Sequence, residues 1–173
     1  MRRALTTLSV LGLVVAPVAV GATKSPVRKS TKYAGTTSQG DVCRHGTTDG
    51  RACDIRFKTS SDRKRIATLT VRWRGGPCSA DPNQFYRAAT DFQDLAIYSS
   101  KSKFKYSGSY TANLAEGATA TNTVALTGRF RRSSSGRYSA SGTFSVVSDV
   151  VQSNGSKTHC ETGKVSWSAK PAK

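Results

Sequence analysis

Apolar and polar residues alternate with a period of two over much of this chain, the pattern of β-strands with one buried face. Ile55 and Phe57 alternate with Arg56 and Lys58, for example, and similar segments recur towards the end of the chain. Gly, Ser and Asn separate these segments, as at 133–136. Several half-buried strands joined by short turns predict an all-β fold, an antiparallel β-sandwich or barrel in a single domain.

The alternation also predicts one strand pairing and leaves one segment open. Pairing Phe57 with Leu69 and Ile55 with Val71 buries both apolar rows together, which makes these two strands a hairpin. The segment 81–92 is different, because it opens with an Asp-Pro pair that can begin a helix. Its apolar residues have helical spacing: Phe85, Ala88, Ala89 and Phe92. We expect either one short helix or a loop there.

Four cysteines allow three disulfide pairings. Asp49-Gly50 is a tight-turn signal, so Cys43 and Cys53 would meet across a hairpin, which leaves Cys78 to pair with Cys160. The alternative is a four-cysteine zinc site, which needs close Cys-x-x-Cys pairs that the chain does not contain. Two disulfides are typical of a protein that folds in an oxidising compartment.

The first 22 residues have the order of a secretory signal peptide. Met1-Arg2-Arg3 precedes an apolar run at 4–20, and Gly21-Ala22 forms a small-residue cleavage site. The run is short for a bilayer span, and no second apolar run follows. We therefore expect a protein without a transmembrane segment, secreted or held noncovalently at the cell envelope. The predicted organisation is a signal peptide at 1–22, a flexible basic leader at 23–32, one all-β domain at 33–170 and a tail at 171–173.

Positive charge is the strongest functional signal. Cleavage would remove two of the 27 basic residues and leave 25 against 10 acidic residues, a formal charge of +15. Predicted outward positions carry the candidate polyanion-binding residues: Arg56, Lys58, Arg72, Arg74, Arg129 and Arg131. Neighbouring outward positions or strand ends add further basic residues: Lys101, Lys103, Lys105 and Arg132.

Rows of this kind predict a face that binds a polyanion, such as an anionic cell-wall polymer. The alternative is a solvated surface that keeps the protein soluble and blocks strand addition. Most aromatic residues fall on the predicted inner face, so the tyrosines that could add aromatic contacts are few: Tyr33, Tyr86, Tyr98 and Tyr138.

Several segments carry a resemblance to known proteins. They are the residues 33–40, Cys78, Gly128-Arg129-Phe130, 140–144 and 160–169. In this order the chain resembles small secreted all-β proteins of actinobacteria, most of them uncharacterised. The resemblance implies a two-sheet antiparallel domain and supports the link between Cys78 and Cys160. It implies no catalytic residue, and Cys43–Cys53 is an addition to the pattern.

The enzyme candidate is His159 with Glu161. Residues two apart on a strand project to the same side, so this pair could act as acid and base in a small secreted hydrolase such as a ribonuclease. Lys157 or arginines would hold the phosphate. The alternative is an ordinary strand end beside a disulfide.

The remaining signals are weaker. His45 lies inside the Cys43–Cys53 loop, and the chain has no Gly-x-Ser-x-Gly elbow for a nucleophile. Arg44 and Arg51 in that loop could make a protease-inhibitor or adhesion module. Asp81, Asp91 and Asp94 could meet a calcium ion, but they form no loop motif. We therefore expect an exported, non-catalytic binding protein that uses no cofactor and no metal.

Overall fold

The computed structural model describes residues 24–40, 43, 52–80, 85–98 and 102–173, and among them it contains nine strands and no α-helix. The strands are β1 (Lys32–Thr37), β2 (Asp54–Thr59), β3 (Arg65–Gly75), β4 (Tyr86–Ala96), β5 (Lys103–Asn113), β6 (Thr119–Arg132), β7 (Tyr138–Val151), β8 (Lys157–Glu161) and β9 (Val165–Pro171). A single 3₁₀ turn, η1 (Ala115–Gly117), lies between β5 and β6. The prediction of an all-β fold is confirmed. No helix in this described part is both long and apolar enough to cross a bilayer.

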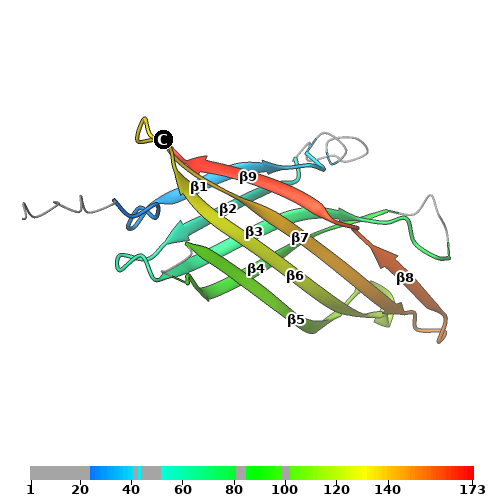
Figure 1. The fold of residues 1–173 in the computed structure, drawn as a ribbon. Helices are drawn as coiled ribbons and strands as arrows, with labels where there is room; N and C mark the ends of the chain where they lie inside the picture. Colours follow the sequence, from blue (N-terminus) through cyan, green and yellow to red (C-terminus); the bar gives the residue numbers. More distant parts are fainter. Residues whose placement is uncertain (1–23, 41–42, 44–51, 81–84, 99–101) are drawn as a thin grey trace, which may run out of the picture.

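All strands belong to one antiparallel sheet with the order β4-β3-β2-β1-β9-β7-β6-β5, and β8 pairs with β7 outside this path. Because most neighbours in the sheet are also neighbours in the sequence, the chain runs up and down and returns when β9 pairs with β1. Figure 1 shows the sheet curling until β4 and β5 face each other, with β8 extending at the end opposite the C-terminus. Of the two predicted architectures the chain adopts the barrel, as one sheet rather than the two sheets that the resemblance implies.

The strand register confirms the predicted hairpin. Phe57 lies opposite Leu69 and Ile55 lies opposite Val71 in the pairing of β2 with β3. These four side chains are buried, so both apolar rows face the barrel interior. Burial of such rows, at about 25 cal/mol per Å² of apolar surface, is the main term that stabilises a sheet closed on itself.

Aromatic side chains fill the end of the barrel interior near the C-terminus. The ring of Tyr33 stacks on Phe57 at 4.7 Å, and both rings meet Phe130 edge-on at 5.6 and 5.9 Å. Phe104 stacks on Trp167 at 5.9 Å. These contacts join β1, β2, β5, β6 and β9, so the packing here holds both halves of the meander together.

The seam between β4 and β5 is closed by side chains. No backbone ladder joins these two strands in the described sheet. The ring of Phe92 instead meets Tyr106 at 5.0 Å, and the hydroxyl of Thr90 lies 3.5 Å from that of Tyr110. The barrel is therefore nearly closed, with its weakest join at this seam.

Both predicted disulfides are present, Cys43–Cys53 and Cys78–Cys160. The second ties the β3–β4 connection to β8, where Gly76 N–H donates to Glu161 and Ser79 N–H donates to His159. The arm formed by β8 is therefore fixed to the barrel by one covalent bond and by backbone hydrogen bonds.

The structure corrects the expectation for 81–92. Residues 81–84 lie outside the described part, but β4 begins at Tyr86, so the rest of this segment is mostly strand rather than helix or loop. Ala88 pairs with Trp73 and Phe92 with Leu69, which buries Phe92 while Phe85 stays 45% exposed. Pairing along the whole of β3 outweighs the local helical spacing. Without β4, the backbone N–H and C=O groups on one side of β3 would have no hydrogen-bond partners.

Part of the predicted basic leader packs against the domain. The predicted signal peptide at 1–22 lies outside the described residues, but Val27 is buried in the core cluster. The hydroxyl of Thr59 donates to the carbonyl of Arg28 at 2.6 Å, and Ser30 N–H donates to the carbonyl of Ser60 at 3.1 Å. The segment before β1 is thus attached to the end of β2.

Candidate anion-binding surface

The basic residues singled out by the sequence face outward, but they form two separate groups. Arg56 and Lys58 lie on β2, and Arg72 and Arg74 lie on β3. Arg129 and Arg131 lie on β6. In the order of the sheet, β1, β9 and β7 stand between β2 and β6. The six residues therefore do not make one continuous patch.

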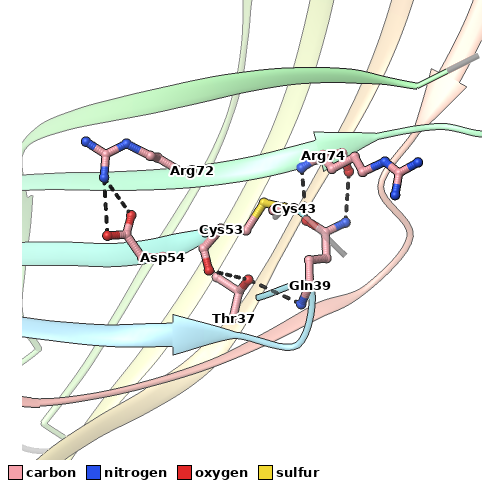
Figure 2. Close-up of a disulfide and its surroundings, with 7 residues drawn as sticks. All are labelled: Thr37, Gln39, Cys43, Cys53, Asp54, Arg72 and Arg74. Carbon is pink, nitrogen blue, oxygen red and sulfur yellow. Dashed lines mark hydrogen bonds and ion pairs between the residues drawn. A yellow bond between two sulfur atoms is a disulfide. The ribbon is translucent and has the colours of Figure 1, made fainter. Parts of the chain in front are cut away.

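The group on β2 and β3 is partly neutralised by Asp54. Arg56 Nε lies 2.7 Å from one Asp54 carboxylate oxygen, and Arg72 Nη1 lies 2.9 Å from the other. Figure 2 shows the Arg72 guanidinium directed at Asp54 beside the Cys43–Cys53 disulfide. The guanidinium of Arg74 lies over the ring of Phe85 at 3.7 Å. These contacts engage three of the four basic side chains in this group, and the single Asp54 carboxylate offsets one of the four positive charges.

Gln39 fixes the end of β3 at the same place. Its amide nitrogen donates to the Arg74 carbonyl at 2.8 Å, and its amide oxygen accepts from Arg74 N–H at 3.0 Å. Figure 2 shows these two bonds next to the disulfide and to Thr37, whose hydroxyl donates to the Cys53 carbonyl. These contacts hold the end of β3 in place, so the residues of this part of the surface have a structural role.

The second group also contains Lys103 and Lys105, which the sequence placed at neighbouring outward positions or strand ends. Lys103 on β5 lies directly opposite Arg129 on β6, and Lys105 lies opposite Thr127. We call the exposed side chains of Lys103, Lys105, Arg129 and Arg131 the β5–β6 basic surface. Within the described residues none of them has a carboxylate at ion-pair distance. Their own strands cannot supply one, because β5 and β6 contain no Asp or Glu.

The spacing makes these charges act together. Outward positions two residues apart on a strand are separated by about 6.7 Å. That distance is shorter than the Debye length of about 8 Å at physiological salt, so the potentials add. Like charges directly opposite in an antiparallel pair destabilise it. An anion bound over Lys103 and Arg129 would relieve that repulsion.

Hydroxyl groups continue from the basic surface across the barrel. Arg129 lies opposite Ser141 on β7, and Ser141 lies opposite Ser168 on β9. Both serines are exposed, so their hydroxyls are open to solvent. Lys170 follows two residues later on the same face of β9. The row offers hydrogen-bond donors between basic side chains.

A shallow hollow of about 650 Å³ lies on this surface, lined by Lys103, Lys105, Arg129, Ser141 and Tyr98. Tyr98 is 50% exposed and is joined to Lys103 by an isolated bridge. Of the tyrosines that the sequence suggested, Tyr33 is buried and Tyr138 lies near the guanidinium groups of Arg28 and Arg132. Tyr86 is bonded to Ser148 in another part of the barrel, so Tyr98 is the one of these four tyrosines that lines the hollow.

His159 has a different partner from the one that the sequence suggested. Its Nδ1 lies 2.7 Å from a carboxylate oxygen of Asp149, which stands opposite it on β7. Glu161 lies on the same outward face of β8, opposite Val147. Both members of the His159–Asp149 pair are exposed. Sequence reasoning missed Asp149 because the pairing of β7 with β8 brings it there.

The other candidates do not converge in the described part of the chain. Asp91 accepts a hydrogen bond from the hydroxyl of Thr70, and Asp94 lies 3.7 Å from Arg65. No group of three His, Cys, Asp or Glu residues suited to a metal ion occurs among the described residues. Outside that part lie the other residues that the sequence singled out: Asp81, His45, Arg44, Arg51 and Lys101.

We compared the chain with known families, proteins and structures and found no match. No protein-family model, no curated protein and no solved structure matches this chain.

Proposed function

We propose that this chain is an exported, non-catalytic protein that binds an anionic polymer through the β5–β6 basic surface. The observation that carries the proposal is the placement of Lys103 directly opposite Arg129, with no carboxylate at ion-pair distance in the described structure. A bound phosphate would exchange this repulsion for two charge-assisted contacts.

A polymer fits this surface better than a single small anion. Positive charge repeats along β5 and β6, because Lys105 follows Lys103 and Arg131 follows Arg129 at alternate positions. Hydroxyls of Ser141 and Ser168 extend the row towards Lys170. A chain with regularly spaced phosphates, such as a cell-wall polymer, could contact several of these groups at once, and each contact would release counterions.

The proposal is tested by removing charge in two places. We would compare binding of poly(glycerol phosphate) by the oxidised mature protein and by two double variants at physiological salt. Lys103→Gln with Arg129→Gln removes two charges from the proposed surface. Lys164→Gln with Lys173→Gln removes two exposed charges, one from the connection between β8 and β9 and one from the segment after β9.

The first double variant should bind at least tenfold more weakly, and the second should change the affinity less than twofold. Equal losses in both variants would mean that the polymer responds only to net charge, which contradicts the proposed site. Thermal unfolding of each variant controls for the fold.

The His159–Asp149 pair supports a second candidate, a small secreted hydrolase acting on RNA. A carboxylate that holds a histidine ring is the arrangement in which histidine acts as a general base. Glu161 projects from the same face of β8 and would supply the second proton-transfer group. The two candidates differ in whether RNA is cut.

A further inference from the structure

The end of the barrel interior next to β8 contains a cavity of about 400 Å³, which we call the β8-end cavity. Its lining comes mostly from inward positions on β3 to β8 and includes the Cys78–Cys160 disulfide. The aromatic cluster fills the other end, so the interior is not uniformly packed. The volume falls in the range of small-molecule pockets, and barrel mouths are a common place for them.

The cavity exists because small side chains from neighbouring strands lie around the same space and leave it unfilled. Ala112 on β5 lies opposite Ala120 on β6, and Ala88 on β4 lines the same space. Larger residues at these inward positions would fill the end of the barrel. Trp73 bounds the space towards the core, where its ring lies 5.4 Å from Tyr86 and 6.2 Å from Phe144. The Trp73 N–H is already bonded to Thr90 at 2.9 Å, so the indole adds an apolar wall.

One wall of the cavity carries an ordered polar chain. The Tyr86 hydroxyl donates to the Ser148 hydroxyl at 2.6 Å, and Ser148 donates to the amide oxygen of Asn122. Ser148 is 1% exposed and Asn122 is 5% exposed. Buried polar groups of this kind are normally fully bonded.

The polar chain is incomplete at Asn122. Its amide nitrogen carries two N–H donors, and the one bond that it makes within the described part of the chain is 3.5 Å long, to the carbonyl of Ala120. That length is at the limit of a hydrogen bond. Because the amide oxygen is held by Ser148, the nitrogen side is the part of Asn122 with donor capacity left for a group inside the cavity.

We propose that the β8-end cavity binds a neutral, largely apolar small molecule that carries one hydrogen-bond acceptor, such as a ketone, for the Asn122 amide. Among the described residues that line the cavity, every side chain is uncharged except that of Arg87, which lies opposite Arg74 in the pairing of β4 with β3. Arg87 is already engaged in another interaction, so a buried charge on the ligand would lack a free partner, which is costly. The acceptor would complete the polar chain at Asn122.

The seam between β4 and β5 provides access. A second hollow, of about 310 Å³, lies along this seam and shares Ala89 and Tyr110 with the β8-end cavity. Side-chain contacts rather than a backbone ladder close the seam, so a rotamer change of Tyr110 would connect the two spaces. This site is inside the barrel and separate from the outer basic surface, so either proposal can fail without the other.

The test uses two ligands that differ only in the acceptor. The first is the neutral ketone 6-propionyl-2-dimethylaminonaphthalene, and the second has a propyl group in place of the propionyl group. Calorimetry on the oxidised mature protein measures both dissociation constants, and energy transfer from the buried tryptophans to the ketone reports that it binds close to the barrel interior. We expect saturable binding of one ketone per chain and at least tenfold weaker binding of the propyl analogue.

Three variants locate the site. Ala120→Leu fills the cavity and should weaken ketone binding at least tenfold, and Ala112→Leu does the same from β5. Ala125→Leu makes the identical change on the outward face of β6 and should leave binding unchanged. Asn122→Leu keeps the size of the side chain and should remove the preference for the ketone.

Other results overturn the proposal. It fails if neither ligand binds saturably, if the ketone and the propyl analogue bind equally, or if Ala120→Leu and Ala112→Leu, folded by near-UV circular dichroism, still bind like the wild type. Poly(glycerol phosphate) binding by Ala120→Leu should be unchanged, which separates this test from that of the outer surface.

Discussion

Lys103 and Arg129 face each other across β5 and β6 as a directly opposed pair of positive charges. Such a pair should cost about 0.2–1 kcal/mol of stability. We therefore expect Arg129→Gln to raise the free energy of unfolding by about that amount at low salt, with the gain shrinking at high salt because screening weakens the repulsion. Urea unfolding at two salt concentrations measures it.

Lys164→Gln is the control, since Lys164 is exposed and lies outside the strands. A lower stability of Arg129→Gln at low salt would show that Arg129 makes a stabilising contact. The charge pair would then no longer point to a ligand.

Labelled RNA separates binding from hydrolysis. The oxidised mature protein should leave the RNA at full length on a denaturing gel, because the main proposal assigns no cleavage to the chain. The His159→Ala variant should give the same result. Shortened RNA from the wild type, lost in both His159→Ala and Asp149→Asn, would instead establish the His159–Asp149 pair as catalytic.

The two disulfides should differ in their contribution to stability. They close loops with sequence separations of 10 and 82 residues. Loop-closure entropy then predicts losses of about 3 kcal/mol when Cys43 and Cys53 become serine, and about 4.5 kcal/mol when Cys78 and Cys160 do. Urea unfolding of the two double variants tests the order. A larger loss of unfolding free energy in the Cys43 and Cys53 double variant would contradict this order. It would show that the shorter disulfide stabilises the folded state by more than loop closure.

Tyr86 should make the fold sensitive to high pH. Burial raises the pKa of its hydroxyl above the usual 10.0, against a smaller lowering by the hydrogen bond to Ser148. The unfolded chain ionises this tyrosine first, so the stabilising contribution is complete below about pH 10 and is lost as the pH rises through the higher folded value. The free energy of unfolding should therefore fall less in Tyr86→Phe than in the wild type between about pH 9 and about pH 11.5. Equal declines would contradict this assignment.

The sequence carried enough information for the strands and their local pairing. Alternation at Ile55 and Phe57 predicted the partners that they have in β3, because the period of two fixes which face is buried. The turn signal at Asp49-Gly50 likewise predicted Cys43–Cys53, which left Cys78 to pair with Cys160, and both disulfides are present. Where the local pattern was helical, at Phe85 to Phe92, pairing with β3 decided the outcome instead.

The candidate sites depended on information that no local pattern holds. The separation of Arg56 from Arg129 follows from the order of the whole sheet, and Asp149 reaches His159 only through the β7–β8 pairing. The β8-end cavity requires small residues on several strands to reach one end of the barrel. All three features arise when the sheet closes into a barrel, because closure brings together residues that are far apart in the sequence.

The most direct test of the outer site is a map of where the polymer binds. Titrating poly(glycerol phosphate) into ¹⁵N-labelled oxidised mature protein should shift the amide signals of Lys103, Lys105, Arg129 and Arg131 in a saturable way, and leave those of Arg56 and Arg72 nearly unchanged. Saturable shifts centred on Arg56 and Arg72, or no saturable shifts at all, would contradict the proposed β5–β6 surface.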